Sequence, residues 1–87
     1  MVEHKELDEL RRKINLLDDR LNETLKKRVE LIKEVGRYKK KNKMPIRNLD
    51  REEEIIQKAI RNNIPERLAR KIYNTIFEEA VKIEEGD

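Results

Sequence analysis

The sequence predicts an all-α protein made of a single domain, residues 1–87. Apolar residues recur at alternating steps of three and four, which is the period of a helix that packs along one face. Only two glycines and two prolines interrupt the chain, so the helices between them must be long. Leucine, isoleucine, valine and phenylalanine number 24 of 87 residues, which exceeds the roughly 20% below which chains stay unfolded.

The first helix is expected over residues 6–42. Its apolar seam consists of Leu7, Leu10, Ile14, Leu17, Leu21, Leu31, Val35 and Tyr38. Gly36 lies within it and costs about 1 kcal/mol without breaking it. At 1.5 Å per residue this helix would be roughly 55 Å long, whereas a compact chain of this size has a radius of gyration of about 12 Å. We therefore expect the chain to form a dimer.

Residues 43–47 are the predicted connector, because the proline in the middle disfavours helix at the residue before it. Asn48 is a plausible N-cap for a second helix, whose acidic first turn suits the helix dipole. Residues 62–65 end that helix, and Pro65 suits the first turn of a third. Gly86 stops the third helix near the C-terminus. Its expected inner face comprises Leu68, Ile72, Ile76, Ala80 and Ile83.

The composition excludes several classes of function. There is no cysteine, and His4 is the single histidine, so neither a disulfide framework nor a thiolate or histidine metal cluster can form. No apolar run approaches the roughly 18 residues of a membrane span, and the start of the sequence lacks a secretory signal, so the expected compartment is the cytoplasm. Residues 26–47 carry ten basic and two acidic groups, and this patch would attract nucleic acid, an acidic membrane surface or a small dicarboxylate.

Thr24 and Arg28 interrupt the apolar seam of the first helix. A guanidinium on a packed seam is costly, so it either pairs with a carboxylate of another helix or marks a polar pocket for an anionic ligand. Lys39 returns to nearly the same helix face, about 20° off and roughly 16 Å further on, although such a lysine is often simply solvated. Arg11 lies about 25 Å from Arg28 along the helix, so it could join that pocket only from a second chain.

Two glutamates continue apolar stripes on the later helices. Glu52 lies three residues after Leu49 and four before Ile56, so it tends inward unless it only complements the helix dipole. Glu84 follows Ala80 on the stripe of the third helix, where the alternative is a frayed helix end with Glu84 in solvent.

Three blocks of this sequence resemble the all-helical class of chorismate mutases. The blocks are Leu10-Arg11-Arg12-Lys13-Ile14 with Leu17-Asp18 and Leu21, Arg28 with Glu30-Leu31 and Glu34-Val35-Gly36-Arg37-Tyr38-Lys39, and Pro45-Ile46-Arg47-Asn48-Leu49-Asp50-Arg51-Glu52. Their spacing matches without an insertion. The resemblance implies an intertwined homodimer of three-helix protomers that converts chorismate to prephenate in phenylalanine and tyrosine biosynthesis, with each site drawing on both first helices.

The resemblance also implies how the substrate carboxylates are held. Arg28 and Arg11 of the partner chain would grip the two carboxylates, with Arg51 supporting the carboxylate end. The reaction is a unimolecular pericyclic rearrangement, so the site needs no nucleophile, metal or cofactor. It needs cations that select a compact conformer and stabilise charge on the ether oxygen.

The remaining implied contacts are to the ether oxygen and the ring hydroxyl. Lys39 would face the ether oxygen and a carboxylate, and Glu52 would accept a hydrogen bond from the ring hydroxyl. The backbone of Asn48, where the family usually has aspartate, would help to hold that hydroxyl. Glu84 stands where bacterial enzymes commonly have a glutamine that donates to the ether oxygen. An ionised carboxylate cannot donate a hydrogen bond. We therefore expect Glu84 to act in its protonated form, and turnover to rise toward acid pH. Ala80 replaces a small polar pocket residue of some relatives.

Three other functions stay open at this point. An isochorismate pyruvate lyase resembles the mutases in fold, although the block 47–52 looks more like the mutases. A non-enzymatic helical dimer could bind nucleic acid through residues 26–47, but 3% aromatic residues offer no stacking platform. A structural coiled coil would use its polar seam positions only to set register.

Overall fold

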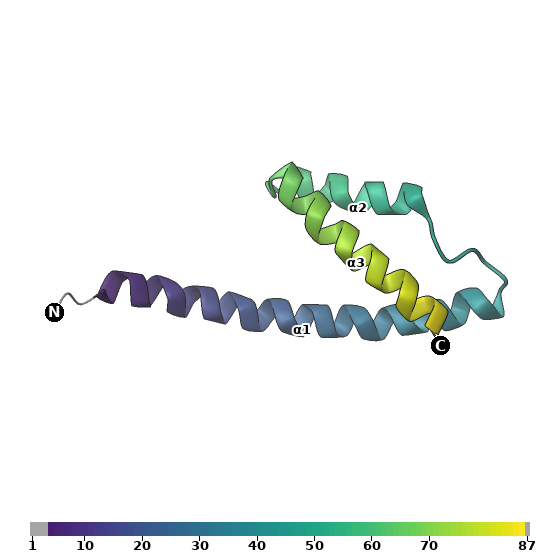
Figure 1. The fold of residues 1–87 in the computed structure, drawn as a ribbon, viewed down its shortest axis with the longest axis horizontal. Coiled ribbons are helices and arrows are strands. Elements are labelled where there is room, and N and C mark those ends of the chain that lie inside the picture. The colour runs from purple at the N-terminus through teal and green to yellow at the C-terminus, as the bar shows by residue number, and fades with distance from the viewer. Residues whose placement is uncertain (1–3, 87) are drawn as a thin grey trace. The chain divides into compact units, whose positions relative to one another are not determined.

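The computed structural model describes residues 4–86, and every regular element among them is an α-helix, which confirms the predicted all-α class. Helix α1 spans Lys5–Lys41, α2 spans Leu49–Arg61 and α3 spans Glu66–Gly86 (Figure 1). By its internal contacts the chain divides into two units, one ending at Glu30 and the other beginning at Leu31.

The first unit is the N-terminal part of α1. Large apolar side chains follow one another along it at helical spacing, and each is between 37% and 60% exposed: Leu7, Leu10, Ile14, Leu16, Leu17, Leu21 and Leu25. A helix with a broad apolar stripe normally buries that stripe against another element. This unit therefore carries a row of exposed apolar side chains along one helix.

Backbone geometry at residues 43 and 63 ends the first two helices. Lys43 adopts the left-handed conformation, with φ of 55°, and the N–H of Met44 donates to the carbonyl of Lys39 at 2.8 Å. Asn63 also adopts the left-handed conformation after α2, with φ of 68°, and the N–H of Ile64 donates to the carbonyl of Ala59 at 3.1 Å. These contacts satisfy helix-end carbonyls that would otherwise lack partners. The first helix therefore ends at Lys41, one residue before the predicted end at residue 42.

Asn48 caps α2 as predicted. Its backbone is extended, with φ of −130° and ψ of 98°, and its side-chain oxygen accepts from the N–H of Arg51 at 3.1 Å. This contact satisfies one of the free N–H groups at the start of the helix, and the acidic residues of the first turn complement the dipole. The cap thus fixes where α2 begins after the connector.

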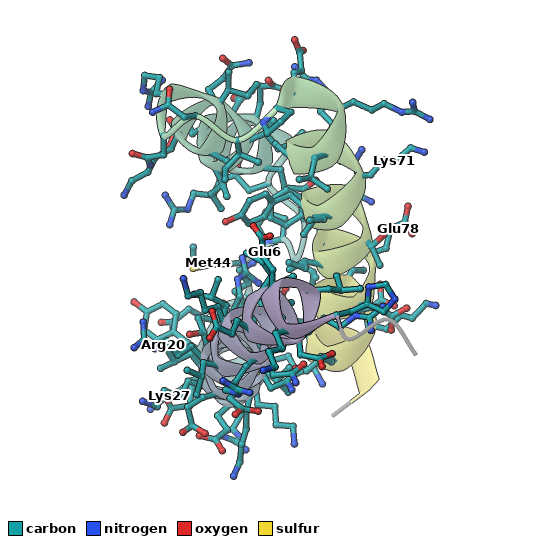
Figure 2. The ribbon with its side chains drawn as sticks, turned by 90° about the vertical axis from the view of Figure 1, so that its left-hand side faces the viewer. Glu6, Arg20, Lys27, Met44, Lys71 and Glu78 are labelled. Carbon is teal, nitrogen blue, oxygen red and sulfur yellow. The ribbon has the colours of Figure 1, made fainter. Side chains whose placement is uncertain are left out.

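The core of the second unit lies between α2 and α3. Its buried residues are Ile56, Ala59, Ala69 and Phe77, with Ile55, Ile60, Tyr73 and Ile76 packed against them. The rings of Tyr73 and Phe77 lie 5.7 Å apart at a tilt of 30°, a favourable aromatic arrangement. On α3, Lys71 and Glu78 point away from the helix into solvent (Figure 2).

The predicted inner face of α3 is partly wrong. Ile76 and Ala80 do lie inward, but Leu68 and Ile72 are 48% and 46% exposed. The helix is apolar around more than one face, and α2 packs on the face that carries Ala69 and Phe77. Periodicity located the apolar stripes but could not tell which of them α2 covers.

A surface ion-pair network joins α2 to α3 outside the core. The guanidinium of Arg70 donates to the two carboxylate oxygens of Glu53 at 3.0 and 3.2 Å, and to Glu66 at 2.9 Å. Gln57 also donates to Glu53 at 2.8 Å. The hydrogen bonds from Arg70 and then from Gln57 lower the pKa of the Glu53 carboxyl, because they stabilise its ionised form.

We expect Arg70→Gln to lower Tm slightly at neutral pH, with the difference from the parent protein vanishing in acid. A lowered folded-state pKa contributes stability above the unfolded pKa of the carboxyl, and this stability is lost as pH falls through the folded value. Thermal melts between about pH 7 and about pH 3 test this, with Arg67→Gln on the same helix as control. A Tm difference that stays constant down to the acid end would contradict the prediction.

Candidate functional site

The site is built where the end of α3 meets the C-terminal part of α1 at Gly36. A Cβ atom on Gly36 would lie 3.0 Å from Cα of Glu84 and 3.3 Å from its Cβ and Cγ. The first of these is a backbone atom, which cannot rotate out of the way. Glycine therefore allows the two helices to approach so closely. The approach buries Glu84, whose side chain is only 6% exposed, so the alternative of a frayed end with Glu84 in solvent is wrong.

Lys39 and Glu84 form an ion pair at this crossing. Nζ of Lys39 lies 2.8 Å from Oε1 of Glu84, and the lysine side chain is 19% exposed. Lys39 is three residues after Gly36, so both lie on the side of α1 that faces α3. Removing two charges from water carries a desolvation cost that their mutual attraction must offset. Such a pair in a small protein is therefore a candidate for function.

Oε1 of Glu84 is a buried acceptor that lies beside the ammonium of Lys39. Nζ of Lys39 is 2.8 Å away, which is the distance of a charge-assisted contact. Among the other residues from 4 to 86, none provides a hydrogen bond to this oxygen. A carboxylate oxygen accepts more than one hydrogen bond, so a ligand atom can also bind there.

Lys39 also reaches the connector between α1 and α2. Its ammonium donates to the carbonyl of Ile46, which is half-buried. One lysine therefore touches three parts of the unit: its own helix, α3 through Glu84, and the connector. An ammonium carries three N–H donors, so Lys39 can bind an anionic ligand in addition to these groups.

A second charged pair lies at the start of α2. Nε and Nη2 of Arg47 each donate to one carboxylate oxygen of Glu52, both at 3.0 Å. Glu52 is 15% exposed and Arg47 is 47% exposed. Glu52 therefore tends inward, as its position between Leu49 and Ile56 predicted, and its carboxylate is held in one plane by a two-donor fork.

The other predicted site residues lie outside these two pairs. Asn48 is exposed and serves as the cap of α2, and Arg51 is 68% exposed, 4.0 Å from Glu54. Arg11 is exposed and Arg28 is half-buried, and both belong to the unit that ends at Glu30. Their participation in one site with Lys39 stays a prediction.

Two residues that matter for the site were not among those predicted for it. For Gly36 the sequence predicts a small cost in helix propensity and a place in the second family block, but not the close approach of α3. Its position one turn before Lys39 is the signal that marks this helix face. Arg47 was seen only as part of a sequence block. No periodicity links it to Glu52, because Arg47 precedes the cap and the connector sets its direction.

Neither a metal centre nor a membrane span is found in the part of the chain that the structure describes. Between residues 4 and 86, no three or more histidine, cysteine, aspartate or glutamate side chains come together where they could hold an ion. Over the same residues, no helix combines the length and the apolar character needed to cross a bilayer. The charged groups of the site are thus lysine, arginine and carboxylates alone.

The fold and the site define a helical protein with a buried Lys39–Glu84 pair where α1 and α3 meet and a partly exposed Arg47–Glu52 pair at the start of α2. Such cationic groups suit an anionic organic ligand. The model of the chorismate mutase type II family matches residues 10–85, and the chain belongs to that family. This confirms the resemblance found in the sequence.

One curated relative is the bifunctional chorismate mutase/prephenate dehydratase of Aquifex aeolicus (strain VF5). The two sequences are 34% identical over 73 residues, which cover 84% of this chain and 18% of the relative. The chain therefore spans less than a fifth of that protein. No solved structure matches the chain.

We expect Gly36→Ala to lower the free energy of unfolding by about 1 kcal/mol. Overpacking against the Glu84 backbone costs about 1–3 kcal/mol, and the better helix propensity of alanine restores about 1. Gly86→Ala is the matched control, because nothing lies within 4 Å of the added Cβ there. Urea unfolding of the three proteins measures the effect. A Gly36→Ala protein that is more stable than the parent by about 1 kcal/mol, the gain expected from helix propensity alone, would contradict the close approach.

Proposed function

We propose that this chain is a chorismate mutase that converts chorismate to prephenate. The single observation that carries the proposal is the buried Lys39–Glu84 ion pair, in a chain of this family. In the reaction one C–C bond forms as the ether C–O bond breaks, within one molecule and without an external proton, electron or cofactor. The product would enter phenylalanine and tyrosine biosynthesis.

The proposed catalytic role of the site is to hold a strained conformer and to stabilise charge. Arg28, Arg51 and Arg11 of a second chain would bind the two carboxylates, which brings the reacting carbons together. Lys39 would donate to the ether oxygen, where negative charge develops as the C–O bond breaks. Its low exposure supports this role, because electrostatic interactions are stronger where water is excluded.

The two glutamates have different proposed roles. Glu52 would accept a hydrogen bond from the ring hydroxyl, and the backbone at Asn48 would assist it. Glu84 would donate to the ether oxygen in its protonated form. Its carboxyl lies beside the ammonium of Lys39, so a ligand atom that contacts the lysine also lies close to Glu84.

We further propose that two chains form an intertwined homodimer. The described residues bury only five hydrophobic side chains: Ile56, Ala59, Ala69, Phe77 and Ala80. The apolar stripe of α1 and the row formed by Ile64, Leu68 and Ile72 are exposed. A second copy would cover both, and small cores commonly need such association. The dimer would also bring Arg11 to a site whose other residues belong to the opposite chain.

The first prediction tests the reaction itself. The purified protein should convert chorismate to prephenate, followed by loss of substrate absorbance and identification of the product. Lys39→Ala should lower kcat/KM by about 10²–10³-fold, the usual cost of losing one donor to developing charge. Lys33→Ala, an exposed lysine of the same helix, should retain the parental rate. A folded parent protein without turnover would refute the proposed reaction.

Mixing two inactive variants tests the shared site. Arg11→Ala and Arg28→Ala should each be nearly inactive, but unfolding and refolding them together should restore about a quarter of the parental activity. Half of the randomly paired dimers are mixed, and each mixed dimer holds one site with both arginines. The same treatment of either variant alone is the control. If each site used both arginines of one chain, the mixture would stay inactive.

The role of Glu84 predicts the pH dependence. Turnover by the parent protein should rise toward acid pH, because only the protonated carboxyl can donate. Glu84→Gln should show a flat profile and a higher rate at neutral pH, since an amide donates at every pH. Steady-state rates between about pH 4 and about pH 8 measure this. A flat parental profile that the substitution leaves unchanged would remove the donor role.

A further inference from the structure

We propose that Arg47 is a positioning residue that orients the carboxylate of Glu52 toward the ring hydroxyl of the substrate. This inference rests on the proposed function, because it gives Arg47 a task in the same site. The observation behind it is the two-donor fork, in which Nε and Nη2 of Arg47 each bind one oxygen of Glu52 at 3.0 Å.

The fork orients the carboxylate of Glu52 and still leaves it able to accept further hydrogen bonds. An ionised carboxylate has about four lone-pair sites, and the fork takes one on each oxygen. The remaining sites stay open for a hydroxyl. A planar guanidinium bound through two parallel hydrogen bonds holds the carboxylate plane, which one hydrogen bond would leave free to rotate. Glu52 therefore presents its open lone pairs in a set direction.

The charge of Arg47 also suits the proposed substrate. Chorismate carries two carboxylates, and a bare glutamate at 15% exposure would repel them. The guanidinium of Arg47 offsets that charge while its own side chain remains half in solvent. Glu52 can then accept a hydroxyl without repelling the dianion that bears it.

The connector links this fork to the lysine at the helix crossing. Lys39 holds the carbonyl of Ile46, and Arg47 is the next residue along the chain. Asn48 then begins α2 as its cap. The backbone of three consecutive residues, Ile46, Arg47 and Asn48, thus connects the contact of Lys39 with the contact of Glu52. The fork sets the position of the hydroxyl acceptor relative to the cation that would face the ether oxygen.

The test compares chorismate with an analogue in which hydrogen replaces the ring hydroxyl. For Arg47→Gln, kcat/KM for chorismate should fall about tenfold or more, as expected for a charged hydrogen bond that is lost. On the analogue the same variant should stay within about twofold of the parent, since there is no hydroxyl to orient. Arg47→Lys keeps the charge but not the fork, so it should recover only part of the loss.

Two further variants separate positioning from a structural role. Arg61→Gln makes the same change at the other end of α2 and should leave both substrates unaffected. In a protein that already carries Glu52→Gln, adding Arg47→Gln should change kcat/KM for chorismate only slightly. The two residues act through one contact, which the first substitution has already removed. Circular dichroism and Tm show whether each variant folds, and the comparison of the two substrates by one folded variant does not depend on its stability.

The possible results distinguish a failure of the proposed role of Arg47 from a failure of the proposed reaction. Equal losses on both substrates, or no loss on either, would overturn the role of Arg47 while leaving the reaction intact. An additive effect of the Arg47 and Glu52 changes would overturn it as well. No turnover of chorismate by the parent protein would overturn the proposed reaction and this role together.

Discussion

The close approach of α1 and α3 at Gly36 is the constraint on which the candidate site depends. Without a side chain at this position, the backbone of Glu84 comes within van der Waals distance of α1, and the carboxylate then lies beside Lys39. Lys39 in turn holds the carbonyl of Ile46 and so the path of the connector. One missing methyl group therefore determines the positions of a buried carboxylate, its cation and the start of the next helix.

The two kinds of ion pair in the second unit have different physical roles. Arg70 and Glu53 bridge α2 and α3 at the surface, where solvent screens the attraction and the pair adds little stability. Lys39 and Glu84 are mostly buried, where desolvation is costly and an apolar pair of similar size would often be at least as stable. The buried pair is therefore better explained by ligand binding than by stability. Electrostatic interactions that are weak at the surface become strong enough in such a place to act on a reacting bond.

Stability and activity are linked through the exposed apolar surface. The chain has 24 leucine, isoleucine, valine and phenylalanine residues, yet only five hydrophobic side chains of the described part are buried. The apolar stripe of α1 and the row formed by Ile64, Leu68 and Ile72 are instead exposed. In the proposed dimer the contacts that cover them are the same contacts that bring Arg11 to the site. Folding, association and assembly of the site would then be one process that depends on protein concentration.

The sequence by itself determined the helical class, the approximate bounds of the three helices, the Asn48 cap, the break at residues 62–65 and the family. These features depend on local propensity and on residues close together in the chain. Only the tertiary structure decided that α2 covers the Phe77 face of α3 rather than the Leu68 face, that Gly36 admits Glu84, and that Arg47 binds Glu52. Gly36 and Glu84 are 48 positions apart, and their contact depends on how the helices cross. Periodicity gives the direction of a side chain around its own helix, but it contains no information on which other helix will pack there.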